Sequence, residues 1–215
     1  KKVLQMSGRF AVLIYGVERN ASLVEREFQN YLFSELGKSA YEFDVFVDVD
    51  DVAEISAVRS SECGSVVPFS EDFLSHVISY VKTDRSAAAR SLLEDIMRFG
   101  DYWDNDWQTN MNLIKQLLTL SSAYKKSLSI SRYDWYFAIR ADVKIVRFDL
   151  NRLLLALQSS SDVFFPNWQR WAGGLNDRVC VVSGDAAPSI FNRGREIYGF
   201  CDHMQEALHP ERFLR

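Results

Sequence analysis

The chain has 215 residues, of which 47% are hydrophobic and 13% aromatic, so it is long enough to form one well-packed domain. Its formal net charge is −4, which disfavours nucleic acid as a partner, because binding to a phosphate backbone usually needs a basic face. No apolar run approaches the ~20 residues of a membrane-spanning helix, and the N-terminus lacks the apolar core of a signal peptide. We therefore expect a soluble, cytoplasmic protein without a membrane span.

Cysteine usage and chain ends add two expectations. Cys63, Cys180 and Cys201 are odd in number and lack the spacing of a metal site, which favours reduced thiols. The chain begins with Lys1 rather than Met, which is compatible with a piece of a longer protein, and the expected place of this piece is N-terminal. It contains no internal repeat or linker, so residues 1–215 are expected to form one domain.

The first third of the chain alternates strand and helix. The apolar run from Phe10 to Tyr15 predicts a strand that ends at Gly16. A helical pattern follows up to Gly37, where a C-terminal cap belongs. From Phe43 to Asp51 apolar and acidic residues alternate, which predicts a second strand with acids at its end.

Three helices and a central strand are predicted next, and the second of these helices has the apolar residues Leu92, Leu93, Ile96 and Met97. Ser70 followed by acids, with apolar residues continuing one face, predicts a helix that extends to Val81. Apolar residues at helical spacing from Trp107 onward predict a longer helix that reaches about Tyr124. It leads into the aromatic and β-branched run from Trp135 to Ile139, which is typical of a buried strand.

The last third predicts shorter elements. Asp149 is placed to cap a short helix, and strands are predicted at 162–166 and 177–183. The loop between these strands carries Trp168, Trp171 and the pair Gly173-Gly174, which combine aromatic rings with backbone freedom. The whole order predicts an α/β fold, with a mostly parallel central sheet flanked by helices.

A charged pair interrupts the apolar pattern where the central strand ends. Arg140 and Asp142 flank Ala141 there, and open α/β sheets bind ligands beyond the carboxyl ends of their strands. A buried charge needs a partner, because an unpaired buried ion is too costly to keep. The plainer alternative is that these two side chains simply pair with each other or with helix ends.

Several short motifs together resemble a known family. These are VLIYGVER on the first strand, DVFV on the second, YDWYFAIRADV after the long helix, and NDR before a late strand. In this order they resemble the nucleotide-sugar glycosyltransferases of the GT-A fold, and are similar to those of large DNA viruses and bacterial capsule clusters. The resemblance implies a single GT-A-like (Rossmann-like) domain that moves a hexose from a nucleoside-diphosphate sugar, UDP-sugar favoured, to a hydroxyl of a glycan or glycoprotein.

The resemblance also implies a donor site. In the family the first loop holds the nucleotide, which corresponds to Gly16, Val17 and Arg19 in this chain. The strand after the long helix usually ends in Asp-x-Asp, which binds Mn²⁺ or Mg²⁺ on the diphosphate. This chain has Arg140 in place of the first acid, so Asp142 is the one expected metal ligand, while Arg140 can meet phosphate by forked hydrogen bonds. The plainer reading of Arg19 is a solvent-facing residue in an ordinary turn.

Other acids receive roles on the same basis. Asp48 and Asp50 end the second strand, which in the family often lies near the nucleoside, so they are expected to contact it; a solvated acidic strand end is the alternative. Asp177 lies in the region that faces the acceptor and is the candidate general base. Its alternative is an ion pair with Arg178 or a charge at a strand edge.

Two rival functions remain open at this point. DVDDV after an apolar strand also resembles the nucleophile motif of haloacid-dehalogenase-like phosphohydrolases, with Asp48 as nucleophile and Asp50 as acid/base. That motif normally lies on the first strand, which counts against it. The other rival is a nucleotide- or glycan-binding module without catalytic activity.

Overall fold

The computed structural model describes residues 8–19, 21–39, 41–52, 54–57, 62–157, 162–166 and 178–213. Its helices and strands, in chain order, are β1 (Arg9–Gly16), α1 (Ala21–Glu27), the π-helix η1 (Phe28–Phe33), α2 (Ser34–Gly37), β2 (Glu42–Asp50), β3 (Glu54–Ala57), β4 (Glu62–Ser65), α3 (Glu71–Leu74), β5 (Ser79–Thr83), α4 (Ser86–Ile96), the 3₁₀ helix η2 (Met97–Phe99), α5 (Gln108–Leu128), β6 (Trp135–Arg140), α6 (Leu150–Leu157), β7 (Val163–Phe164), β8 (Val179–Ser183), α7 (Ala187–Phe191), the 3₁₀ helix η3 (Arg193–Glu196), α8 (Ile197–Met204) and α9 (Pro210–Phe213).

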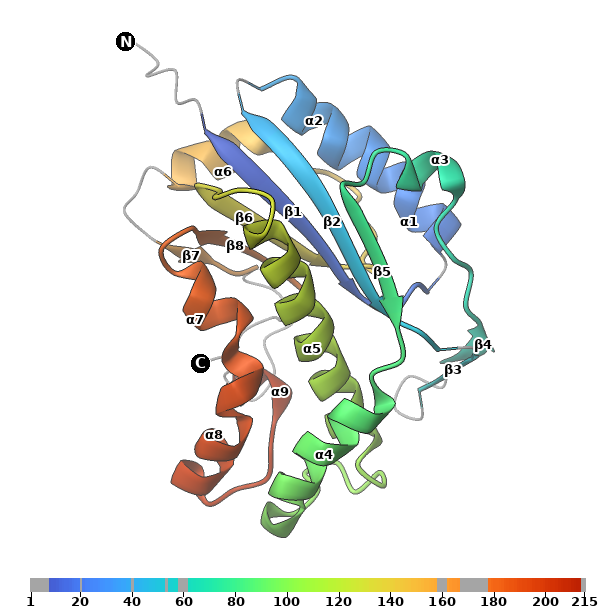
Figure 1. The fold of residues 1–215 in the computed structure, drawn as a ribbon, viewed down its shortest axis with the longest axis vertical. Helices are drawn as coiled ribbons and strands as arrows, with labels where there is room; N and C mark the ends of the chain where they lie inside the picture. The colour runs from blue at the N-terminus through green and yellow to red at the C-terminus, as the bar shows by residue number, and fades with distance from the viewer. Residues whose placement is uncertain are drawn as a thin grey trace.

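A six-stranded sheet forms the centre of the fold, with strand order β5-β2-β1-β6-β8-β7. Strands β5, β2, β1 and β6 are mutually parallel, whereas β8 runs antiparallel to both of its neighbours. Helices cover both faces of the sheet (Figure 1). The predicted α/β class with a mostly parallel sheet is therefore confirmed.

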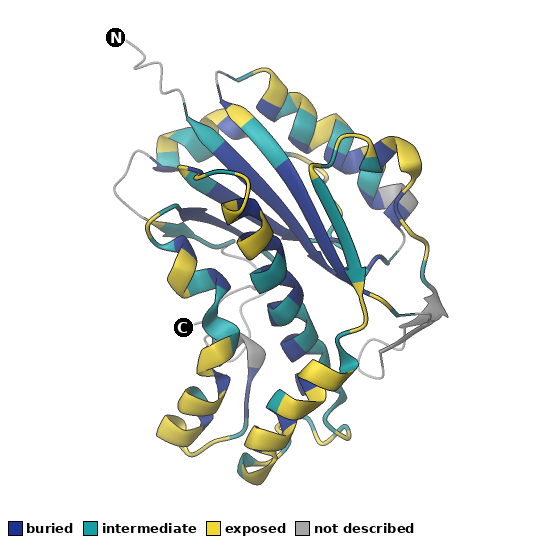
Figure 2. Cartoon of the chain, in the orientation of Figure 1, coloured by how far each residue is buried: buried dark blue, intermediate teal, exposed yellow. Residues whose placement is uncertain are grey.

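One face of the sheet packs against the continuous helical segment α1–η1–α2, together with α3 and α6. The segment turns Val24, Phe28, Leu32 and Leu36 towards the sheet, and all four are at most 4% exposed. These residues recur at helical spacing, which is why this part of the chain buries one stripe against β1 and β2. Figure 2 shows the middle of both strands as buried.

The other face packs against α5 and α7. The C-terminal half of α5 supplies Leu120, Ala123 and Tyr124 to this layer, while its N-terminal half packs with α4 and α8 in a separate apolar cluster. In Figure 1 this cluster of helices extends past the carboxyl ends of the parallel strands. None of the described helices is both long and apolar enough to cross a membrane.

The chain between 70 and 83 differs from its prediction. Ser70 does cap a helix, since its Oγ accepts from the backbone N of Phe73 at 3.2 Å, but α3 ends at Leu74. The predicted extension to Val81 is wrong, because β5 is an edge strand that pairs in parallel with β2. The register places Asp48 opposite Val81.

The ends of four strands meet at one edge of the sheet, which we call the carboxyl edge. Register pairs join Tyr15 to Asp48 on one side and to Arg140 on the other, so these residues form one row across three strands. Adjacent strands lie about 4.8 Å apart, which places the Cα atoms of Asp48 and Arg140 roughly 10 Å from each other. Two groups of charged side chains predicted from the sequence thus lie at the same edge.

Candidate functional site

The first strand ends in a sharp turn at the carboxyl edge. Gly16 has φ of +103°, a conformation that residues with a Cβ rarely adopt. Its N–H donates to Oγ1 of Thr119 on α5 at 3.1 Å, and the N–H of Arg19 donates to the carbonyl of Val17 at 2.8 Å. The loop from Gly16 to Arg19 therefore folds back over the end of the sheet.

The buried side chain of Glu18, for which the sequence predicted no role, anchors this loop to neighbouring segments of the fold. It is 1% exposed, and its Oε1 accepts from the hydroxyl of Tyr80 at 2.9 Å and from the N–H of Phe69 at 3.3 Å. Lys82 Nζ lies 3.3 Å from its other carboxylate oxygen. These contacts fix Glu18, and through the backbone they hold its two neighbours, Val17 and Arg19, in position. Both neighbours are residues that the sequence predicts for the donor site.

The structure brings Arg19, Arg140 and Asp142 together. Arg140 donates twice to Asp142, from Nε to Oδ1 at 2.9 Å and from Nη2 to Oδ2 at 2.6 Å. Arg19 Nε lies 3.9 Å from Oδ2 of the same carboxylate. The N–H of Ala141 donates to the carbonyl of Tyr15 at 2.7 Å, which locks the end of β6 to the end of β1.

This cluster is electrostatically unusual because one carboxylate faces two guanidinium groups. The side chains are 15% exposed for Arg140 and Asp142 and 22% for Arg19. Burial alone would raise the pKa of Asp142, but the charge and hydrogen bonds of Arg140, followed by the charge of Arg19, lower it below its ordinary value. Guanidinium groups match the oxygens of phosphates and carboxylates by paired hydrogen bonds, so this cluster contains the groups that recognise an anion.

Among the described residues, the side chains around Asp142 do not form a preformed metal site. Both oxygens of Asp142 already accept hydrogen bonds from Arg140. In the part of the chain that the structure describes, no three His, Cys, Asp or Glu side chains gather as metal ligands would. Two carboxylates would supply oxygen ligands at this position, whereas this chain supplies a guanidinium and a carboxylate that already accepts two hydrogen bonds.

Asp48 and Asp50 have internal partners. Asp48 is 1% exposed and accepts from Arg85 Nη2 at 2.5 Å, while Asp50 is 2% exposed and accepts from Lys115 Nζ at 2.9 Å and from the N–H of Arg85 at 2.9 Å. Burial raises the pKa of Asp48 to about 6, outweighing the hydroxyl of Ser122 and the guanidinium of Arg85, which act to lower it. A nucleoside or a phosphate could reach these carboxylates only after the ion pairs had opened.

The candidate base Asp177 lies outside the described residues, as do Trp168, Trp171 and the pair Gly173-Gly174. Arg178 is described, and its carbonyl accepts the N–H of Arg140 at 3.0 Å. The start of β8 is therefore bonded to the last residue of β6, beside the arginine cluster.

Comparison with protein-family models finds no match, and neither does comparison with curated proteins. Among solved structures, the fold is similar to that of mouse xyloside xylosyltransferase 1 in its apo form, with 10% identity, a TM-score of 0.45, and coverage of 97% of this chain and 80% of that one. It is also similar to core-mannan synthase A from Aspergillus fumigatus in a Mn/GDP form, with 10% identity, a TM-score of 0.46, and coverage of 94% and 68%. At this level of similarity neither structure assigns a substrate or an activity.

Proposed function

We propose that this protein is a glycosyltransferase that moves a hexose from a nucleoside-diphosphate sugar to a glycan hydroxyl. The observation that carries the proposal is the convergence of Arg19 and Arg140 on Asp142 at the carboxyl edge. Ligands of open α/β sheets bind beyond this edge, and guanidinium groups match phosphate oxygens by paired hydrogen bonds. UDP-sugars are the favoured donors on the family resemblance described above.

In the proposed reaction the acceptor oxygen bonds to the anomeric carbon while the bond from that carbon to the diphosphate breaks. Negative charge then grows on the leaving diphosphate. Arg140 would stabilise this charge more strongly in the transition state than in the bound donor, which is the condition for accelerating the reaction. Asp142 holds the guanidinium in a fixed orientation by two hydrogen bonds, so little reorganisation is needed when the donor arrives.

We further propose that Asp177 removes the proton from the acceptor hydroxyl. The sequence places it directly before Arg178, whose carbonyl is bonded to Arg140. Asp177→Asn should then reduce transfer by roughly 10²–10⁴-fold, the range for loss of a general base, while the affinity for the donor stays nearly constant. Full transfer by this variant, or loss of donor affinity measured by calorimetry, would remove Asp177 from this role.

A divalent ion remains a proposed cofactor, and Mn²⁺ and Mg²⁺ are the candidates. Mg²⁺ is commonly bound through one or two carboxylates and substrate phosphates. Each Asp142 oxygen keeps a second lone pair beside its hydrogen bond from Arg140, so Asp142 is the proposed single protein ligand. Asp142→Asn removes charge at nearly constant shape and should therefore weaken any metal-dependent part of donor binding. If Asp142→Asn and the wild type showed the same dependence of donor affinity on Mn²⁺ or Mg²⁺ concentration, Asp142 would be excluded as a ligand.

The proposal is tested by calorimetry with UDP- and GDP-sugars, each with Mn²⁺ and with a chelator. Arg140→Ala should weaken donor binding by about 10- to 100-fold, because hydrogen bonds to charged groups contribute about 1.5–3 kcal/mol. It should also slow donor hydrolysis without acceptor. Arg90→Ala, on the exposed surface of α4, is the matched control and should bind the donor as the wild type does. Equal affinities for Arg140→Ala and wild type, or no saturable binding of any donor, would refute the proposal.

The phosphohydrolase alternative gains no support from the described residues. Its nucleophile would be Asp48, whose carboxylate is buried and bonded to Arg85. A covalent aspartyl-phosphate trapped at Asp48 would nevertheless establish that function. Donor binding with neither hydrolysis nor transfer would instead establish a binding module.

A further inference from the structure

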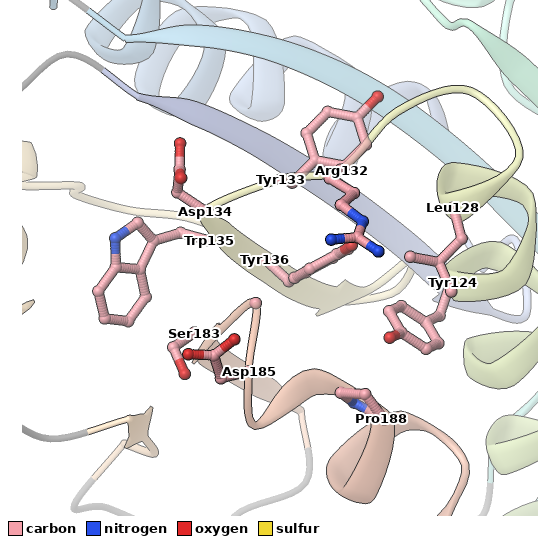
Figure 3. A pocket seen from close by; sticks show the side chains of 11 residues that line it. Tyr124, Leu128, Arg132, Tyr133, Asp134, Trp135, Tyr136, Ser183, Asp185 and Pro188 are labelled. Atoms are coloured by element: carbon pink, nitrogen blue, oxygen red, sulfur yellow. The ribbon is translucent and has the colours of Figure 1, made fainter.

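A cavity lies at the end of the parallel strands that is opposite to the arginine cluster. It has a volume of about 480 Å³ and lies between the C-terminal end of α5, the start of β6 and the start of α7 (Figure 3). Trp135, the first residue of β6, lines it, whereas Arg140 is the last residue of the same strand. At about 3.3 Å per residue these two positions are roughly 16 Å apart, so this pocket is not part of the proposed donor site.

The floor of the pocket is aromatic and held in place by internal contacts. The ring centroids of Tyr124 and Tyr136 are 5.2 Å apart in an edge-to-face arrangement, and Tyr133 packs against Tyr136 at 5.8 Å. The Tyr133 hydroxyl donates to Asp44 at 2.7 Å. Gly184 also lines the pocket, and its backbone packs directly against that of Tyr133. A Cβ at position 184 would lie 2.5 Å from the carbonyl oxygen of Tyr133, so only glycine fits there without a shift.

The rim of the pocket carries opposite charges that do not meet. Arg132 and Asp185 are exposed, and Figure 3 shows Tyr136 between them. Within the described ranges neither side chain has an ion pair or a hydrogen bond, and the Tyr124 hydroxyl has no hydrogen-bond partner there either. The Ser183 hydroxyl accepts from the N–H of Ala186 at 3.3 Å and keeps its own proton to donate.

These groups define the chemistry of a ligand. A guanidinium donates, a carboxylate accepts, and the hydroxyls do both, so the pocket offers donors and acceptors in mixed order. The exposed side chains of Leu128 and Pro188 add an apolar wall. Asp134 and Asp185 outnumber Arg132 on the lining, which disfavours a phosphate or another anion.

We propose that this pocket binds a neutral pyranose unit of a glycan. A pyranose presents hydroxyl groups, each of which can donate and accept, around a ring with apolar C–H faces, and both kinds of surface have counterparts here. The volume lies within the range of small-molecule sites, about 300–1,000 Å³, which are likewise apolar with a few placed polar groups. The proposal does not depend on the transferase function, although a bound glycan here would tether a polymeric acceptor.

The test uses neutral methyl pyranosides as probes, with saturation-transfer NMR and titration of the wild type and four variants. Asp185→Asn and Arg132→Gln should each weaken binding about tenfold, the effect of losing one charge-assisted hydrogen bond. Asp95→Asn and Arg90→Gln make the same chemical changes on the exposed surface of α4 and should bind like the wild type.

Three results would overturn the proposal. One is the absence of binding of any pyranoside at millimolar concentration. Another is preferential binding of inorganic phosphate or of the zwitterion glycine at Asp185 and Arg132, which would assign the pocket to a different ligand class. The third is loss of pyranoside binding in Arg140→Ala but not in Asp185→Asn, which would place the sugar at the carboxyl edge. Failure of donor binding would leave the pyranoside result standing, so the two proposals fail separately.

Discussion

Replacing Asp48 by Asn should change how the stability of the protein depends on pH. Burial raises the folded-state pKa of Asp48 from its ordinary value of 3.8 to about 6. A raised pKa means that the contribution of Asp48 to stability is fully present below about pH 4 and is lost as the pH rises through 6. The difference of roughly 2 pKa units corresponds to about 3 kcal/mol, which is a large part of the 5–15 kcal/mol that stabilises a typical domain.

Asp48→Asn keeps the shape of the side chain and removes this titration. The free energy of unfolding of the variant, minus that of the wild type, should therefore rise by about 3 kcal/mol between about pH 4 and pH 8. Urea denaturation followed by tryptophan fluorescence at several pH values measures this difference. Asp95→Asn, on the exposed surface of α4, serves as the control and should give a flat difference. A flat difference for Asp48→Asn would show that Arg85 and Ser122 cancel the effect of burial, and a difference that falls with pH would show that they outweigh it; either result would refute the reasoning.

Two further substitutions test other internal contacts. Arg85→Ala leaves the carboxylate of Asp48 buried without its cation, so it should lower the free energy of unfolding by about 3–5 kcal/mol at pH 8. The control Arg90→Ala should change the free energy of unfolding little. Equal effects of the two substitutions in urea denaturation would contradict a stabilising role for the buried ion pair. Tyr133→Phe removes a hydrogen bond to the carboxylate of Asp44 and should cost about 1.5 kcal/mol by the same measurement, and no loss would show that this bond contributes nothing to stability.

The sequence predicted the interior strands of the sheet well because their signal is local. The residues from Phe10 to Tyr15 and from Tyr136 to Ile139 are buried in the middle of the sheet, and a continuous apolar run is the direct consequence of that position. Strand β5 was predicted as helix for the opposite reason. It lies at the edge of the sheet, where its residues are only partly buried, and its apolar side chains also fit the spacing of a helix.

The sequence predicted some of the contacts among the charged side chains, whereas their functional roles stay a prediction. Arg140 and Asp142 are two residues apart and pair with each other, which was one of the two alternatives that the sequence left open. Arg19 lies beside them. The partners of Asp48 and Asp50 could not be predicted, because Arg85 and Lys115 are 37 and 65 residues further along the chain. Arg85 reaches Asp48 through the pairing of β5 with β2, and Lys115 reaches Asp50 through the packing of α5 against the sheet. Asp177 lies outside the described residues and stays a prediction.

The two acidic motifs differ most in how their charge is balanced. At the end of β2, Asp48 and Asp50 are matched by Arg85 and Lys115, so the four groups sum to zero when all are ionised. At the end of β6, the carboxylate of Asp142 lies, among the described residues, against the guanidinium groups of Arg19 and Arg140. Under the proposed function the diphosphate would therefore meet the two arginines at the end of β6, whereas at the end of β2 it would first have to separate Asp48 and Asp50 from Arg85 and Lys115.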